Sequence, residues 1–386
     1  MRGTREGWVL LCKQVRWSHW WKLPTPLEVF SVFMKERGYA IELSAPGRLV
    51  TQMVANLGGL WGVTSIAHEE IVRLLNSMAH GVIEDPDGSA ESDRTARCRR
   101  KVRPQVASRD EWFGLLKKIN NNEAWLAERR LASLVNNGVL RVGLYLSCPQ
   151  CSQRTWYGLS DILPSLTCER CLQKFEFPAA TPPDKWWYRS VGSYAVENYS
   201  QGGVCVALAL RFLSEPMEGA TTWIPSFNLK KDDKSLEADF GVFWRPSFLD
   251  ESNPTLVFGE CKSYDRFEEK DFRRMRKLGE AFPGAVLAFC MFRKSFSAFE
   301  KRRLKALASS GRSHLQAGRW RNPVLIMTGE DLFSYFNAQW SWKTRMQGRE
   351  YPLQSLCEES QQRYLGMESY SRWLERKAER RRRGQT

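Results

Sequence analysis

Residues 236–264, LEADFGVFWRPSFLDESNPTLVFGECKSY, decide the fold of this chain. They contain two apolar runs separated by a turn rich in Pro, Asp, Glu, Ser and Asn, which indicates two strands and their connection. Asp239 lies in the first run, and the second run ends at Glu260, Cys261 and Lys262. Because successive side chains of a strand point to opposite faces, Glu260 and Lys262 share one face. We therefore expect two carboxylates and a lysine to converge at the ends of neighbouring strands.

The sequence around this stretch predicts an α/β fold in which helices flank a mixed sheet. A helix capped by Asp184 is expected to run to about Tyr199, and the apolar run 204–213 is expected to form a central strand. Further strands are predicted at 221–227, 236–244, 255–262, 285–292 and 323–328, and further helices at 265–280, at 295–310 and from 329 onward.

The predicted helix at 265–280 is amphipathic. Its apolar side chains lie on one side, whereas basic residues recur at i, i+3, i+4 and i+7 on the other; they are Lys270, Arg273, Arg274 and Lys277. This basic stripe comes one element after Glu260 and Lys262. Phosphate contact and an ordinary solvated helix face are both open interpretations of it.

Composition favours an anionic partner. The 386 residues include 58 Lys and Arg against 43 Asp and Glu, for a formal net charge of +15, and 42% are hydrophobic, as in globular proteins. Nucleic acid is the leading candidate, with DNA favoured over RNA. No apolar run is long enough to span a bilayer, and no export signal is recognisable, so we expect a cytoplasmic protein without a membrane partner. A homodimer stays open.

Two cysteine pairs predict a zinc ribbon over residues 145–178. The pairs are Cys148-Pro-Gln-Cys151 and Cys168-Glu-Arg-Cys171, a spacing that lets two knuckles present four thiolates to one tetrahedral Zn²⁺. Ser152 and Leu172 stand where a glycine often follows the second cysteine. The metal is expected either to staple a segment too small for its own core or to support nucleic-acid contact; the contact residues would be Arg154, Trp156, Tyr157 and Arg170.

The remaining segments are assigned from local composition. Residues 1–83 are expected to be mainly helical, residues 84–96 to be a linker, and residues 97–144 to be a helical or winged-helix-like segment. Residues 339–386 form a tail of aromatic and basic side chains. This tail is expected either to bind a nucleic-acid backbone or to be disordered.

Residues 184–338 resemble the PD-(D/E)xK nuclease superfamily, the restriction-endonuclease-like fold. The resemblance is carried by Asp239 in one strand, by the triplet from Glu260 to Lys262 that ends the next, and by the basic helix and apolar strand that follow. Ala238 replaces the proline that names the motif. The resemblance implies that Asp239 and Glu260 bind Mg²⁺ or Mn²⁺, that Lys262 is the catalytic lysine, and that Glu197 assists from the first helix.

The resemblance further implies a divalent-metal-dependent DNA endonuclease that serves, with protein partners, in bacterial restriction or anti-phage defence. The chemistry is consistent with this, because phosphodiester cleavage needs charge neutralisation at the phosphate and an activated water. Carboxylate oxygens suit hard cations, and a lysine can orient or deprotonate the water. The alternative is a catalytically inactive nucleic-acid-binding adaptor that recruits another defence component.

Overall fold

The computed structural model describes residues 2–4, 7–9, 24–79, 105–177, 186–214, 221–245, 253–316, 319–335 and 353–382. Contacts divide the chain into two compact units, each described here by itself. The first comprises Met1–Arg48, Phe212–Thr328 and Phe336–Thr386, and the second comprises Leu49–Arg211 and Gly329–Tyr335. The linker predicted at 84–96, residues 97–104 of the segment predicted at 97–144, and residues 339–352 and 383–386 of the tail lie outside the described residues.

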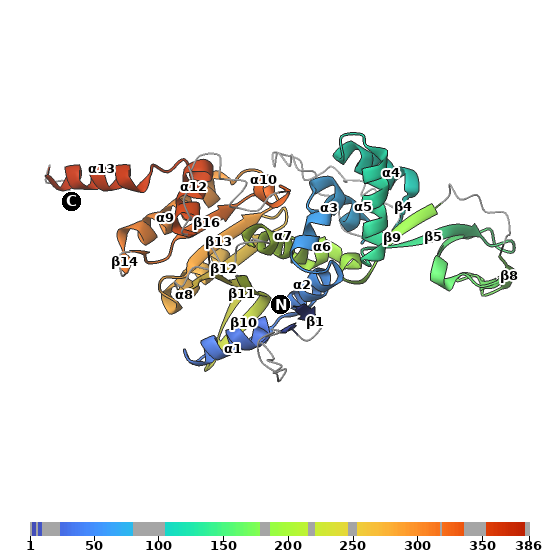
Figure 1. The fold of residues 1–386 in the computed structure, drawn as a ribbon, viewed down its shortest axis with the longest axis horizontal. Helices are drawn as coiled ribbons and strands as arrows, with labels where there is room; N and C mark the ends of the chain where they lie inside the picture. The colour runs from blue at the N-terminus through green and yellow to red at the C-terminus, as the bar shows by residue number, and fades with distance from the viewer. Residues whose placement is uncertain are drawn as a thin grey trace, which may run out of the picture. The chain divides into compact units, whose positions relative to one another are not determined.

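A six-stranded mixed sheet forms the centre of the first unit (Figure 1). Its strand order is β16 (Val324–Met327), β13 (Val286–Met291), β12 (Thr255–Lys262), β11 (Lys234–Trp244), β10 (Thr221–Lys231) and β3 (Ala40–Leu43). The pairs β12–β13 and β13–β16 are parallel, whereas the other neighbours are antiparallel. The predicted strands of this unit from 221 onward are therefore confirmed, and β3 joins them from the amino-terminal region.

Helices flank this sheet. They are α1 (Pro26–Lys35), α8 (Glu269–Ala281), α9 (Ala298–Ser313) and α12 (Leu353–Leu365); α13 (Tyr370–Arg382) follows α12 and extends away from the sheet (Figure 1). The helix α8 packs on β11, β12 and β13 through Phe272, Met275 and Leu278, whose burial stabilises the fold by about 2 kcal/mol each. The helix α9, predicted at 295–310, begins at a capping box formed by Ser297 and Glu300.

The helix α12, near the carboxy terminus, belongs to the first unit. It packs against β16, where the Gln361 side chain donates to the Val324 carbonyl at 2.7 Å and the Ser360 hydroxyl accepts the Ile326 N–H at 3.2 Å. Disorder, one of the two expectations for the tail, is therefore wrong for residues 353–382. Short pairs complete the unit: β1 (Arg2–Thr4) with β2 (Gly7–Val9), and β14 (Leu315–Gln316) with β15 (Arg319–Trp320).

The second unit combines helices with a four-stranded antiparallel sheet in the order β4 (Ala107–Ser108), β9 (Trp186–Ser190), β5 (Leu140–Ser147) and β6 (Arg154–Gly158). The helices are α2 (Ala45–Asn56), which begins in the first unit, α3 (Glu69–Met78), α4 (Arg109–Ile119), α5 (Ala124–Asn136), α7 (Gly203–Leu213) and α10 (Gly329–Leu332), with a 3₁₀ turn at Trp61–Ile66. The hairpin of β7 (Ser165–Thr167) and β8 (Lys174–Glu176) carries the second cysteine pair in its turn. No helix in the described ranges is long and apolar enough to cross a membrane.

Two elements between 184 and 213 differ from the prediction. The expected helix is instead the strand β9, a 3₁₀ turn at Gly192–Ala195 and the short α6 (Glu197–Gln201). The aromatic residues at 186–188 favour a strand, and β5 supplies its partner. The expected central strand is α7, whose residues 204–213 are all buried. A helix buried on every side has no polar face, so its sequence cannot be told from a buried strand by periodicity.

The segment α6 is a left-handed turn. The φ angles of Asn198, Tyr199, Ser200 and Gln201 are 55°, 55°, 58° and 54°, a region that costs L-residues about 1–2 kcal/mol each. The side-chain oxygen of buried Asn76 accepts the Tyr199 N–H at 2.7 Å, and the Ser200 hydroxyl donates to the Ser193 carbonyl at 2.7 Å. These contacts hold the turn in its unfavourable conformation.

Candidate functional site

The pairing of β11 with β12 places Asp239 beside Glu260. Phe240 pairs with Gly259, so Asp239 follows directly opposite Glu260, and its Oδ2 accepts the Cys261 N–H at 2.6 Å. A Cβ on Gly259 would lie 2.0 Å from the Phe240 ring. Glycine is therefore required for the ring to pack flat across β12, and this packing keeps the two strands in register next to the carboxylates.

Lys262 joins the two carboxylates on the same face. Its Nζ lies 3.3 Å from Glu260 Oε1 and 3.2 Å from the carboxylate of Asp271 on α8. Asp271 is fully buried and also accepts the Glu268 N–H at 2.8 Å, which makes it part of the capping box that begins α8. The start of α8 is thereby fastened to the end of β12.

Arg274 completes the cluster from the next turn of α8. Its guanidinium pairs with Glu260 Oε1, lies 3.4 Å from Asp271, and contacts Glu237 on β11 at 2.6 Å. We call Glu237, Asp239, Glu260, Lys262, Asp271 and Arg274 the carboxylate cluster. Arg274, predicted as part of a basic stripe for phosphate, is held inside this cluster, whereas Lys270, Arg273 and Lys277 are exposed.

Burial perturbs the titration of both strand carboxylates. Removal from water raises the pKa of Asp239 to about 7, and burial together with the charge of Asp239 raises the pKa of Glu260 to about 8. Burial opposes the charge of Lys262, but Glu260 and Asp271 outweigh it and raise the pKa of the ammonium group. The lysine is thus a cation at neutral pH, and the two carboxyl groups favour an additional positive charge.

The carboxylate oxygens fit a hard cation. Glu260 Oε1 faces Lys262 and Arg274, whereas the buried Oε2 has no hydrogen-bond partner among the described residues. Oxygen donors of this kind are the ligands that Mg²⁺ uses, usually one or two carboxylates with water and substrate oxygens. Among the residues that the structure describes, a metal-holding group of three or more His, Cys, Asp or Glu side chains occurs only at the cysteines.

Three members of the carboxylate cluster were predicted to be catalytic, and two were missed. Asp239, Glu260 and Lys262 lie together in the first unit, whereas Glu197 begins α6 in the second unit, so its proposed assistance stays a prediction. Glu237 and Asp271 were not predicted as site residues. Glu237 precedes Asp239 by one strand period, and Asp271 stands three residues after Glu268, so alternation and capping spacing were the available signals.

The four predicted zinc ligands converge. The sulfurs of Cys148, Cys151, Cys168 and Cys171 all lie within 4.8 Å of one another and could hold a metal such as zinc. The separations Cys148–Cys171 and Cys151–Cys168 are 3.7 and 3.6 Å, close to the ~3.8 Å that Zn–S bonds of about 2.3 Å give in a tetrahedron. The Cys171 backbone N–H is the main cause that lowers the pKa of the Cys168 thiol to about 6, which favours the thiolate.

Each cysteine pair forms a tight knuckle. In the first, the Cys148 N–H donates to the Gln153 carbonyl and the Ser152 N–H to the Cys148 carbonyl, both at 2.9 Å. The second knuckle repeats both bonds from Cys168. Ser152 and Leu172 have φ angles of 56° and 60°, so they adopt the left-handed conformation for which glycine is usual. The absence of glycine there does not prevent the turn.

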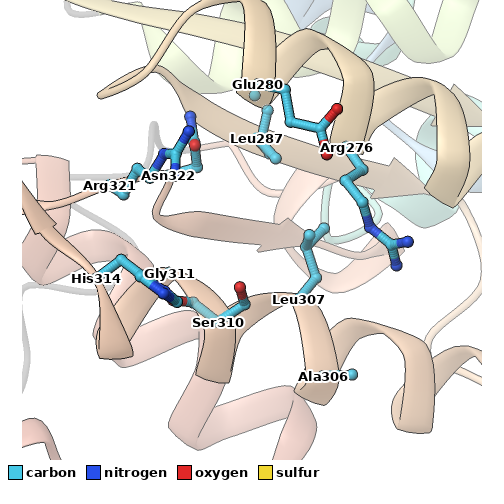
Figure 2. A pocket seen from close by; sticks show the side chains of 11 residues that line it. Arg276, Glu280, Leu287, Ala306, Leu307, Ser310, Gly311, His314, Arg321 and Asn322 are labelled. Carbon is cyan, nitrogen blue, oxygen red and sulfur yellow. The ribbon is translucent and has the colours of Figure 1, made fainter.

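A separate cavity of about 370 Å³ lies between α8 and α9 (Figure 2). Arg276 and Glu280 reach it from α8, and Ser310 and Leu307 from α9. Asn322 also lines the cavity, and its amide donates to the Phe282 and Ala285 carbonyls at 3.2 and 2.9 Å. No residue that lines this cavity belongs to the carboxylate cluster.

Comparisons with known proteins give no family. No protein-family model matches this chain, and no curated protein matches it. A solved structure described as "Crystal structure of protein VC1899 from Vibrio cholerae" is similar at a TM-score of 0.31 and 10% identity; the match covers 85% of this chain and 64% of that one. This chain therefore spans less than two thirds of that protein's length. A likeness this weak supports no statement about the fold or function of the present chain.

Proposed function

We propose that this chain is a divalent-metal-dependent nuclease that hydrolyses phosphodiester bonds of DNA. The observation that carries the proposal is the convergence of Asp239, Glu260 and Lys262 on one face of β11 and β12, with Glu260 Oε2 buried and lacking a partner among the described residues. Membership of the restriction-endonuclease-like fold, and a role in restriction or anti-phage defence, belong to the same proposal. They rest on the sequence resemblance.

Asp239 and Glu260 would hold Mg²⁺ or Mn²⁺. When bound, the ion would neutralise charge at the scissile phosphate and acidify a water molecule. The raised pKa of Lys262 makes its ammonium group a donor that orients the water and offsets phosphate charge, rather than a resting base. Arg274 and Lys262 already pair with Glu260 Oε1, so Oε2 is the oxygen left for the ion.

We further propose that the four cysteines hold a structural Zn²⁺. The small apolar cluster beneath them consists of Leu144, Leu146, Leu166 and Phe175 together with Cys148 and Cys168. A core of this size gives little stability by itself, so the metal would contribute much of the folding free energy of the segment.

The alternative is a catalytically inactive nucleic-acid-binding adaptor. One observation favours it: Lys262 and Arg274 both pair with Glu260 Oε1, so this side chain has two cationic partners within the chain itself. Such an arrangement is stable as a structural ion-pair network, and buried networks of this kind occur without catalysis. Metal-dependent cleavage distinguishes the two functions.

The test is cleavage of plasmid and linear DNA by the full chain with Mg²⁺ or Mn²⁺. The wild-type chain should cut, and Asp239→Asn and Lys262→Met should each reduce the rate by at least about 100-fold, the scale of one lost electrostatic group. Asp265→Asn and Lys294→Met make the same chemical changes at exposed positions of the same unit and should leave the rate unchanged. Cleavage by Asp239→Asn at the wild-type rate would refute the proposal, whereas salt-sensitive DNA binding without any cleavage would favour the adaptor.

A further inference from the structure

One face of the four-stranded sheet in the second unit is built from aromatic and arginine side chains. Opposite partners in an antiparallel pair point to the same face, and the strand registers pair Tyr145 with Trp156 and Arg141 with Arg189. Alternation then places six side chains on this face, which we call the aromatic–arginine face: Arg141 and Tyr145 on β5, Arg154 and Trp156 on β6, and Trp187 and Arg189 on β9.

The three rings lie close together. Tyr145 and Trp187 are 5.1 Å apart between ring centroids, at an interplanar angle of 87°, and the Trp156 indole donates to the Trp187 carbonyl at 3.4 Å. A Cβ on Gly143 would lie 2.6 Å from the Trp156 ring, so the missing side chain lets the indole lie across β5. The rings thus form one patch on neighbouring strands about 4.8 Å apart.

This patch is not required to form the hydrophobic core. The opposite face of the same strands carries Leu140, Leu144, Leu146 and Tyr188, all buried, and that face supplies the core. On the aromatic–arginine face the three arginines are exposed and the three rings are partly exposed. Large aromatic side chains that remain in contact with water without packing a core commonly mark a binding surface.

The charge of the face is positive. Arg154 lies over the Tyr145 ring at 5.5 Å and Arg189 over the Trp156 ring at 5.8 Å. Within the described part of the chain, Arg154 and Arg189 have no acidic partner. Arg141, the third arginine of the face, pairs with Asp161 at 3.5 Å. Guanidinium groups beside exposed rings can contact phosphates while the rings stack on bases.

We propose that the aromatic–arginine face binds single-stranded nucleic acid by stacking its bases and contacting its phosphates. Stacking requires unpaired bases, because the ring faces of a duplex are covered by neighbouring bases. The inference deepens the proposed function, and rests on it in taking nucleic acid as the substrate, by giving the strandedness of the polymer and a binding site in the second unit. Tyr157, expected from the sequence to contact nucleic acid, points to the opposite face, where its hydroxyl donates to the Thr167 carbonyl at 3.1 Å.

The test measures fluorescence anisotropy of the full chain, purified without chelator and with no added Mg²⁺. Its probes are labelled oligo(dT), oligo(rU) and a matched duplex, each of about 20 nucleotides, longer than common single-strand sites. Both single strands, or one of them, should bind more tightly than the duplex. Tyr145→Leu should weaken this binding by about 5- to 100-fold, whereas Tyr145→Phe, which keeps the ring, should bind like wild type.

Two further variants test the phosphate contacts. Arg154→Gln and Arg189→Gln should each reduce the slope of log affinity against log salt concentration by about 0.7, the value for one lost contact to a single strand. Trp125→Leu and Arg129→Gln change exposed residues of α5 in the same unit and should alter neither affinity nor slope. Because the arginines are exposed, these variants remain informative if Tyr145→Leu fails to fold.

The outcomes separate this inference from the nuclease proposal. Tighter binding to the duplex, no single-strand binding, or unchanged binding by Tyr145→Leu and both arginine variants would overturn the inference and leave cleavage untouched. If single-strand binding depends on the aromatic–arginine face but the chain cleaves no DNA, the inference holds and the nuclease proposal is refuted.

Discussion

Glu260 presents its two oxygens to different surroundings. Oε1 contacts the cations of Lys262 and Arg274, whereas Oε2 is buried and lacks a hydrogen-bond partner in the described residues. Removing one cation from such a group leaves a buried charge uncompensated, which is usually more costly than the intact pair is favourable. The residue that binds the metal in our proposal is therefore also a structural link between β12 and α8.

The raised pKa values predict how stability depends on pH in the metal-free chain. Asp239 and Glu260 have ordinary pKa values near 4 when unfolded and about 7 and 8 when folded, so the folded state binds more protons between these values. Their contribution to the free energy of unfolding is fully present below about pH 4 and is lost as pH rises through 7 to 8. Urea denaturation of the chain between pH 5 and 9 should show this loss.

Asp239→Asn should remove at least half of that pH dependence, because one of the two titrating groups is gone and so is the charge that helps to raise the pKa of Glu260. Millimolar Mg²⁺ should also flatten the profile of the wild-type chain, because a bound cation favours the ionised carboxylates. Asp265→Asn is the matched control and should retain the wild-type profile. Stability that rises between pH 6 and 8 in the metal-free wild type would contradict the assignment of the buried charges.

At the scale of elements, the first cysteine knuckle joins β5 to β6 and the second joins β7 to β8. Cys168→Ser should lower zinc content from about one per chain to a small fraction and expose the segment to proteolysis, because four thiolates supply the tetrahedral site. Cys357→Ala removes a buried cysteine from α12 and should retain the zinc. Metal analysis by mass spectrometry and limited proteolysis measure both effects. Zinc well below one per chain in a well-folded wild-type sample would refute the site.

The left-handed turn gives a second prediction at this scale. Asn76→Ala removes the acceptor of the Tyr199 N–H and should lower the free energy of unfolding by about 0.5–1.5 kcal/mol, since a hydrogen bond that holds the turn is lost. Asn198→Gly should raise it by up to about 1 kcal/mol, because glycine adopts a φ of 55° without strain. Thermal melts of both variants against wild type would show whether the turn is held as described.

The sequence allowed some elements to be predicted better than others, for physical reasons. The helix α8 was predictable because its apolar and basic residues recur with helical spacing and Glu268 caps it. The helix α7 was not, because burial on every side removes the period. The left-handed turn at 198–201 depends on Asn76, 123 residues earlier in the chain, and no local pattern predicts such a contact.

The same distinction applies inside the carboxylate cluster. Asp239, Glu260 and Lys262 could be placed on one face because strand alternation fixes side-chain direction over short distances. The pairing of Arg274 with Glu260 could not be predicted, because it depends on how α8 packs across the sheet. Arg274, which the sequence suggested as a phosphate contact, is consequently paired with carboxylates of the chain itself.

At the scale of the whole molecule, the formal charge of +15 is compatible with an anionic polymer as the partner. Our proposals assign different tasks to the two units. The first unit carries the carboxylate cluster, and the second carries the cysteine cluster and the aromatic–arginine face. Charge alone could not distinguish these tasks. The strand registers were needed to show that the carboxylates meet on β11 and β12, and that the aromatic side chains meet on β5, β6 and β9.

The first cysteine knuckle would make the aromatic–arginine face depend on the zinc available to the cell. Cys148 follows the last residue of β5, and Arg154 begins β6 directly after the bond between the Cys148 N–H and the Gln153 carbonyl. The knuckle therefore sets the register in which Tyr145 lies opposite Trp156. If zinc holds the knuckle, zinc starvation would disorder the face that we propose binds single-stranded nucleic acid. The chain would then lose affinity for its substrate without any change in the carboxylate cluster.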